Sequence, residues 1–350
     1  MILRASLLLI ILSACLHAKA ADERFSVSDW NKRLATSLKR DGLQKAARLL
    51  DMKSLEAKVL PSCTNCSEKM KLTRARKLFA EGKYTQAIAL YNQIPKGTDY
   101  WFQAVEERGW GHFRQENMEK ALAQTKTLIS PQFSEVVSSE AFFLQSLSQL
   151  RMCDYKSVFE THALFKEKQK ARIMAIQELA VSGMNEAFTK VIAKADKFPL
   201  RMTDAGSALS SLPLLFYKDT QIQSELLKYK ISQKAIETLR AANYSKLQAQ
   251  MERLNSASMA KLIARMKDLA QQETEANFKI VQKLNLVEVE AIQRVHTDLA
   301  MDKSLYNEKK FEKVNDDQLV FMDDGRPWID ELDKYEVAAK SCAKDIRRKM

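Results

Sequence analysis

Glycine and proline are scarce in this chain. Among its 350 residues there are 8 Gly and 6 Pro, about 4% together, where roughly 12% is usual. Sandwiches, barrels and dinucleotide-binding α/β folds need many tight turns, so this scarcity argues against them and favours long helices with few interruptions. Because 46% of the residues are hydrophobic and only 29% are charged, the chain can bury a core and is not expected to be disordered.

Catalytic and metal-binding motifs are also missing. The chain has no P-loop, no G-x-G-x-x-G, no H-E-x-x-H and no nucleophile elbow. His112, His162 and His296 lie far apart, without an obvious serine or cysteine arrangement around them. The acidic residues between 316 and 324 lack the alternating spacing of an EF-hand loop. We therefore expect a non-enzymatic protein with no cofactor and no bound metal.

A long hydrophobic run is absent as well, and the one short run lies at the N-terminus. Ala5–Leu12 is too short to span a membrane, which takes about 20 residues. With a basic residue before it and small residues after it, residues 1–20 are predicted to be a secretory signal. Cleavage after Ala18-Lys19-Ala20 would leave a soluble periplasmic protein. Alternatively, Leu12-Ser13-Ala14-Cys15 resembles a bacterial lipobox, which would place a lipid anchor on Cys15.

Four cysteines remain after Cys15, an even number in an oxidising compartment. Cys63 and Cys66 form a C-x-x-C pair just before a predicted helix. A local structural disulfide, a redox-active pair and half of a metal site are the alternatives; no βαβ pattern surrounds the pair and no second pair completes a zinc site. By elimination Cys153 and Cys342 could pair, which would tie the C-terminus to the middle of the chain.

A repeated helix-turn-helix pattern organises residues 71–168. The turns fall at Gly82, Glu116 and Cys153, 34 and 37 residues apart, and 34 residues is the tetratricopeptide (TPR) period. Small residues occupy the position where paired helices would cross, and large ones follow each turn. The small residues are Ala75, Gly109 and Ser146, and the large ones are Tyr84, Met118 and Tyr155. The pattern predicts three TPR-like helix pairs.

These repeats and a C-terminal stretch resemble exported TPR proteins of gliding and predatory bacteria, mostly of unassigned function. The resemblance rests on Gly109-Trp110, Pro131-Gln132-Phe133, Glu140-Ala141, Cys153-x-Tyr155, and Gly325-x-x-Trp328-x-Asp330-Glu331-Leu332-x-x-Tyr335 with the following Cys342. It implies an interaction or assembly protein of the cell envelope and carries no particular chemistry with it.

In such repeats the first helix of each pair lines a concave groove. Arginines beside aromatic residues suit an extended peptide or a partner helix, because the rings supply area and a guanidinium can hold a carboxylate by two hydrogen bonds. The alternative is that the aromatics are core, covered by other helices of the chain. The predicted groove residues are Arg76, Phe79, Glu106, Trp110, Phe113, Arg114, Phe143, Leu147 and Arg151.

The rest of the chain is predicted to be helical too. Residues 21–70 form N-terminal helices, the second over 43–59, and 169–219 form connecting helices. In 220–318 apolar residues recur every three or four positions with coiled-coil character, and the polar cluster Asn255–Ser258 suggests a break between two long antiparallel helices. In 319–350 Trp328, Leu332 and Tyr335 are expected to dock a final helix onto the repeats. The predicted fold is all-α.

The charge balance allows one further class of partner. The formal net charge is +12, which suits anionic envelope polymers or lipid headgroups if it is more than solvated helix surface. Nucleic acid is not expected for an exported protein without a basic-aromatic module. We therefore predict a non-enzymatic periplasmic scaffold that binds a partner protein or peptide, within an envelope assembly or motility complex. The alternatives are a thiol-disulfide redox protein using Cys63 and Cys66, or a lipoprotein that binds an envelope polymer.

Overall fold

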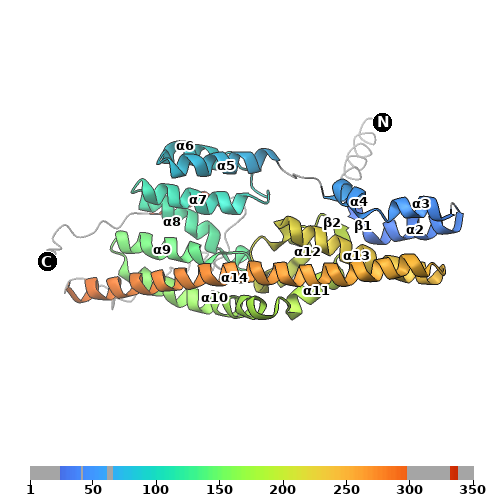
Figure 1. The fold of residues 1–350 in the computed structure, drawn as a ribbon. Helices are drawn as coiled ribbons and strands as arrows, with labels where there is room; N and C mark the ends of the chain where they lie inside the picture. The colour runs from blue at the N-terminus through green and yellow to red at the C-terminus, as the bar shows by residue number, and fades with distance from the viewer. Residues whose placement is uncertain (1–23, 41, 61–65, 298–331, 338–350) are drawn as a thin grey trace, which may run out of the picture. The chain divides into compact units, whose positions relative to one another are not determined.

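The computed structural model describes residues 24–40, 42–60, 66–297 and 332–337 (Figure 1). These residues are predominantly helical, which confirms the all-α prediction at that level. Their strands are β1 (Phe25–Ser26) and β2 (Lys197–Phe198), which pair antiparallel with Phe25 opposite Phe198. In the described part of the chain, no helix is both long enough and apolar enough to cross a bilayer. The fold divides into two compact units, described separately below.

Unit 1 combines residues up to 62 with 192–201 and 217–262. Its helices include α2 (Val27–Arg40), α3 (Gly42–Leu49), α4 (Met52–Val59) and α13 (Thr220–Ala241). Trp30 and Leu34 of α2 are buried, as are Ile222 and Leu226 of α13. The predicted helix over 43–59 is two helices, because the Asp51 side chain accepts a hydrogen bond from the Lys53 amide and caps a new start.

The long helix α14 (Ser245–Thr297) begins in unit 1, to which it belongs as far as Leu262. The predicted break at Asn255–Ser258 is wrong. Asn255 lies inside α14 and donates to the Tyr229 carbonyl oxygen (3.1 Å) and to Ser232 Oγ (3.0 Å) of α13. Its polar group is therefore satisfied between helices. The turn lies at Asn243, whose φ is 61°.

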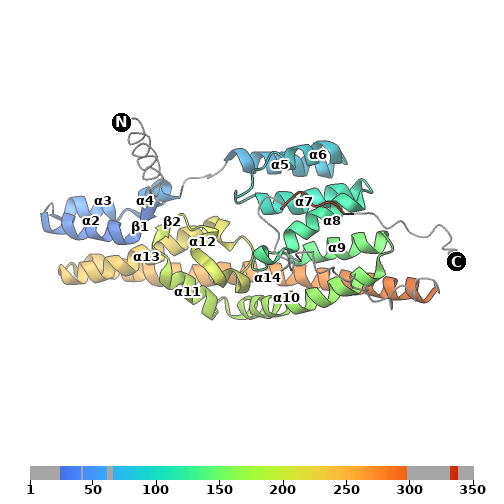
Figure 2. The ribbon, with the colours of Figure 1, turned by 180° about the vertical axis from the view of Figure 1, so that it is seen from behind.

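Unit 2 contains three successive helix pairs. They are α5 (Cys66–Ala80) with α6 (Tyr84–Tyr91), α7 (Trp101–Arg114) with α8 (Met118–Ile129), and α9 (Ser139–Arg151) with α10 (Tyr155–Ser182). Figures 1 and 2 show these pairs in successive layers, with the second half of α14 beside α9 and α10. Helix α10 runs past residue 168, where the repeats were expected to end, and stops at Gly183 in the left-handed region.

The turns inside the three pairs have the same backbone geometry. Gly82, Glu116 and Cys153 all have positive φ, at 75°, 59° and 57°. After each of them an amide donates to a carbonyl oxygen five residues earlier, as in a Schellman motif. These bonds are Lys83 N to Leu78 O (2.9 Å), Asn117 N to His112 O (3.0 Å) and Asp154 N to Gln149 O (2.9 Å). The positions that the spacing aligned are thus equivalent in conformation.

Small residues allow the pairs to pack closely. Ala75 and Ser146 are fully buried, and a Cβ atom placed on Gly109 would lie 2.8 Å from Leu144 Cδ2. The second half of α14 completes the same core with one apolar face, and Ser139 Oγ lies 2.8 Å from Asn277 Oδ1. The residues of that face are Ile280, Leu284, Val287, Ala291 and Val295.

Shorter elements connect α10 to α13. They are α11 (Glu186–Lys194), β2, α12 (Met202–Ala205) and the 3-10 helices Gly206–Ser211 and Phe216–Lys218. Within unit 2, the buried Arg172 of α10 holds part of this connection. It donates to the carbonyl oxygens of Leu209 and Leu212 (2.8 Å each) and pairs with Glu273 of α14 at 2.7 Å. Glu273 also accepts a hydrogen bond from the Leu214 amide.

The C-terminal segment is described over residues 332–337, and there the predicted final helix is wrong. Leu332 and Asp333 form a turn, and residues 334–337 have no regular secondary structure. Leu332 is nevertheless buried, and its carbonyl oxygen accepts a hydrogen bond from Lys96 Nζ (2.5 Å). The backbone here is held by side chains of the helix pairs, so it needs no helix of its own to dock. Trp328 lies outside the described residues.

Candidate binding pocket

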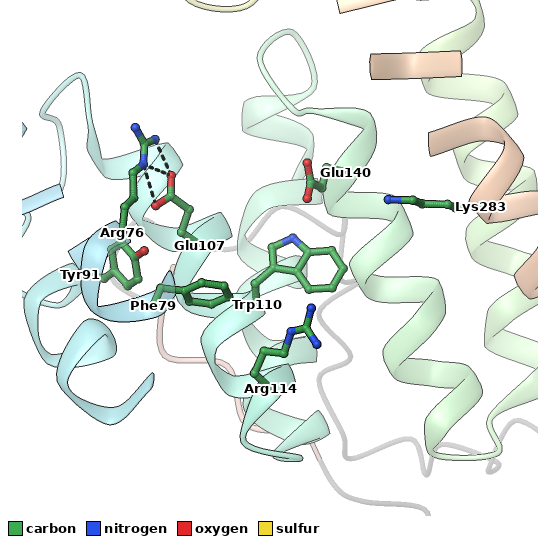
Figure 3. Close-up of a pocket in the computed structure, with 8 residues that line it drawn as sticks. All are labelled: Arg76, Phe79, Tyr91, Glu107, Trp110, Arg114, Glu140 and Lys283. Atoms are coloured by element: carbon green, nitrogen blue, oxygen red, sulfur yellow. Dashed lines mark hydrogen bonds and ion pairs between the residues drawn. The ribbon is translucent and has the colours of Figure 1, made fainter. Parts of the chain in front are cut away.

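A pocket of about 420 Å³ opens among the first helices of the three pairs and α14 (Figure 3). Helix α5 contributes Arg76 and Phe79, and α7 contributes Glu107, Trp110 and Arg114. The remaining walls come from Tyr91 of α6, Glu140 of α9 and Lys283 of α14. Among the residues predicted for the groove, Arg76, Phe79, Trp110 and Arg114 line this pocket.

The other predicted groove residues lie around it rather than in its lining. Phe113 and Phe143 both pack against the Trp110 ring, with centroids 5.6 and 5.7 Å away. Leu147 is half-buried against the core, whereas Arg151 is exposed. The aromatics therefore serve partly as core, as the alternative interpretation held, and Trp110 belongs to both.

Four lining residues were missed by the sequence analysis. Glu107 lies on the same face of α7 as Trp110, three positions earlier, and Glu140 lies three positions before Phe143 on α9. Helical spacing could have indicated both. Nothing in the sequence indicated Lys283, because it reaches the pocket only through the packing of α14, and Tyr91 lies on a second helix.

On one side of the pocket, Arg76 and Glu107 form an ion pair in which the two charges balance. Arg76 Nε lies 2.9 and 3.0 Å from the two carboxylate oxygens of Glu107, and Arg76 Nη2 lies 2.5 Å from Oε1. The hydrogen bonds that Arg76 donates to the Glu107 carboxylate raise the pKa of Arg76. Burial, followed by the charge of Glu107, raises the pKa of the neighbouring Tyr91 hydroxyl, which stays protonated. The charged groups on this side of the pocket are therefore paired with each other and need no partner from a ligand.

The other side carries cations that no described carboxylate pairs with. Arg114 is exposed at the pocket mouth, and no acidic residue of the described chain lies within ion-pair distance of it. Lys283 lies with its ammonium group 5.4 Å from the centroid of the Phe143 ring. Trp110 Nε1 is buried without a hydrogen-bond partner among the described residues, and Figure 3 shows it on the side of Glu140.

The carboxyl group of Glu106, on α7, is buried next to the start of α9. Glu106 makes a short hydrogen bond with Ser138, the N-cap residue of α9. Burial is the main cause that raises the pKa of Glu106 to about 7; the Ser138 hydrogen bond opposes the shift, and the nearby charges of Glu140 and Glu107 add to it. The predicted groove residue Glu106 therefore lies in the packing between α7 and α9.

No protein-family model, curated protein or solved structure matches this chain. The pocket therefore has to be interpreted from its own geometry. It has an aromatic floor, the ion pair between Arg76 and Glu107, and three charged residues, Arg114, Lys283 and Glu140, that form no ion pair within the described part of the chain.

Among the cysteines named in the predictions, Cys153 is the one whose side chain the structure describes. It is buried at the turn between α9 and α10 and is disulfide-bonded. Its predicted partner, Cys342, lies outside the described residues, as do Cys15 and Cys63, and the side chain of Cys66 at the start of α5 is not described. The Cys153–Cys342 pairing, the redox hypothesis and the lipid anchor therefore stay predictions.

His162 lies at a packing position between helices. Its Nδ1 lies 3.3 Å from Glu288 and its Nε2 lies 3.1 Å from Ser146 Oγ. Burial lowers its pKa. Among the described residues, no group of three or more His, Cys, Asp or Glu side chains is arranged to hold a metal ion. His162 is thus placed as a hydrogen-bonded core residue.

Proposed function

We propose that this protein is a non-enzymatic TPR scaffold that binds an acidic, partly apolar segment of a partner protein in the pocket of Figure 3. Two features support the TPR assignment: turns with equivalent geometry 34 and 37 residues apart, and the origin of the lining. Most of the lining comes from α5, α7 and α9, the first helices of the pairs, and first helices line the concave face of such a stack.

The observation that carries the proposal is the pair of unmatched cations beside an aromatic floor. Arg114 and Lys283 both line the pocket and form no ion pair with a carboxylate of the described residues, whereas Arg76 is already paired. Glu140, the remaining carboxylate of the lining, balances at most one of these two cations. A ligand carboxylate would supply the missing partner through charge-assisted hydrogen bonds. Phe79 and Trp110 would cover an apolar side chain next to it. The volume suits a few residues of an extended peptide.

From the predicted signal over residues 1–20 we further propose that this binding occurs in the periplasm, with the protein either soluble or anchored through Cys15. A scaffold of this kind would hold an envelope protein within a larger assembly. Anionic envelope polymers are the second class of ligand that the same cations could attract.

The test removes the two unmatched cations together. The double variant Arg114→Ala/Lys283→Ala should lose the partners captured from envelope extracts, and its affinity for an acidic peptide found among them should fall about tenfold or more, since two charged hydrogen bonds are lost. The matched control is Arg253→Ala/Lys261→Ala, which removes an exposed Arg and an exposed Lys from α14 outside the pocket. An unchanged partner set in the first variant would refute the assignment of the pocket.

A further inference from the structure

The second half of α14 has an exposed apolar face in addition to its buried one. Phe278, Leu286, Val289 and Ile292 are 62%, 70%, 51% and 41% exposed. At about 100° per residue these four side chains fall within a sector of about 120°. The core face formed by Ile280, Leu284, Val287, Ala291 and Val295 lies on the opposite side of the helix. We call the four exposed residues the α14 stripe.

Three of the four residues of the α14 stripe follow a heptad pattern, and Leu286 flanks it. The positions 278, 282, 285, 289 and 292 are separated alternately by four and three residues, which is the spacing of a helix seam that packs against another helix. Gln282 and Asn285, both exposed, supply polar positions at its centre. Exposed apolar side chains gathered in this way on one face are typical of an interaction surface.

The charges along one edge of the stripe indicate what binds there. Lys279 and Glu290 lie on the same edge, eleven residues apart, at opposite ends of the stripe. If a second α14 packs antiparallel about a two-fold axis near Asn285, Phe278 faces Ile292 and Lys279 faces Glu290, each contact occurring twice. In a parallel pair, Lys279 would lie about 16 Å along the axis from Glu290 of the other helix, and neither charge would find its opposite.

We propose that the α14 stripe is a self-association surface at which a second copy of this chain binds antiparallel. A two-fold interface uses the same patch on both copies and closes on itself, so it gives a dimer and no filament. The two Asn285 side chains would meet near the axis and fix the register, as a buried polar pair does in coiled coils. Glu290 is already paired with Arg294 Nε at 2.7 Å within α14, but its side chain is 44% exposed, so a second cation can reach its carboxylate.

The first test measures mass against concentration, by light scattering or sedimentation of the full chain. Wild type should pass from monomer to dimer between about 1 and about 100 µM, because a patch of this size lies at the weak end of specific interfaces. Leu286→Glu should raise the dissociation constant at least about 100-fold, since it buries an unpaired charge. The control Met174→Glu, at a 59% exposed position of α10, should leave it unchanged.

The second test separates the antiparallel register from other contacts. Lys279→Glu should weaken the dimer about fivefold, because two equivalent exposed ion pairs become repulsive, and adding Glu290→Lys should restore the affinity. A wild type that stays monomeric, with the stripe covered by residues 298–331 or by another protein, would overturn the proposal. So would a dimer that Leu286→Glu leaves intact, or one that the charge exchange fails to rescue.

Discussion

Glu106 is a residue whose position in the helix packing makes the stability of the fold depend on pH. Its carboxyl group is held between α7 and α9 by Ser138, near Glu107 and Glu140. Arg76 pairs with Glu107, and no cation of the described residues forms an ion pair with Glu106. With a pKa of about 7, against about 4.3 in an unfolded chain, the folded protein binds this proton more tightly. The contribution of Glu106 to stability is therefore fully present below its unfolded pKa and is lost as the pH rises through about 7.

Glu106→Gln removes this titration while keeping a polar group beside Ser138. At pH 5 the variant should be about as stable as wild type, and at pH 8 it should be more stable, by at most about 3 kcal/mol for a shift of this size. Urea unfolding followed by circular dichroism at both pH values measures the difference. Glu119→Gln, at an exposed carboxylate of α8, is the control. If Glu106→Gln follows wild type at every pH, Glu106 does not titrate in this way.

At the scale of elements, each helix pair is joined by a turn in which one residue has a left-handed backbone conformation. Gly82 adopts it without cost, whereas Glu116, at φ 59°, carries a Cβ there. Gln115, one position earlier, has a φ of −85°, where a side chain is well tolerated. The three turns are therefore equivalent in shape but not in strain.

Because Glu116 has a positive φ and Gln115 does not, glycine substitutions at these two positions should change the stability of the fold in opposite directions. Glu116→Gly should stabilise the fold by several tenths to about 1 kcal/mol, because relief of strain outweighs the extra entropy of glycine in the unfolded chain. Gln115→Gly gains no such relief and should destabilise it, while Gly82→Ala should cost about 1 kcal/mol. Chemical denaturation of the three variants tests the pattern. Equal effects of Glu116→Gly and Gln115→Gly would contradict it.

Local sequence patterns were enough to predict the turns of the helix pairs and the face of α7 that carries Trp110 and Arg114. They failed at positions whose structure depends on contacts between distant parts of the chain. The spacing of Gly82, Glu116 and Cys153 aligned positions that share one conformation, and the helical period placed Trp110 and Arg114 together. Asn255 was read as a helix break because a polar residue inside a helix is locally unfavourable, yet α13 satisfies its side chain. Lys283 enters the pocket from a helix more than 160 residues further along the chain than Trp110, a contact that no local pattern encodes.

At the scale of the whole molecule, the described residues of the later part of the chain pack against the helix pairs of unit 2 and leave its pocket open. Helix α14 supplies one wall through Lys283. Residues 332–337 contribute nothing to the lining, because they bind on another side of α7: Asp333 pairs with Arg108, and its amide donates to Thr127 Oγ1 (3.0 Å). Along α7, Arg108 projects well away from the sector that holds Trp110 and Arg114. Within the described residues, the candidate pocket and the docking of the C-terminal segment therefore use different surfaces.

The Asp333–Arg108 pair should make that docking a measurable part of the stability of the fold. Arg108 is 8% exposed, and burial lowers its pKa. Its other bonds go to the neutral oxygens of Gln124 and Asn92. Asp333→Ala would leave this cation without a carboxylate and should cost about 3 kcal/mol in urea unfolding. Glu186→Ala, which breaks the exposed pair with Lys190, should change nothing measurable.

The double variant Arg108→Met/Asp333→Asn shows whether the stability is lost through a buried unpaired charge or through missing hydrogen bonds to the segment. It removes both charges, keeps apolar volume at position 108, and places at position 333, where φ is 76°, a residue that tolerates the left-handed region. Most of the stability should therefore return, since an uncharged replacement of a buried ion pair is often neutral. If the double variant is as unstable as Asp333→Ala, the loss comes from the hydrogen bonds that position the segment. If Asp333→Ala itself is as stable as wild type, the segment does not hold the helix pairs together, and the fold of unit 2 depends on α14 and the pairs alone.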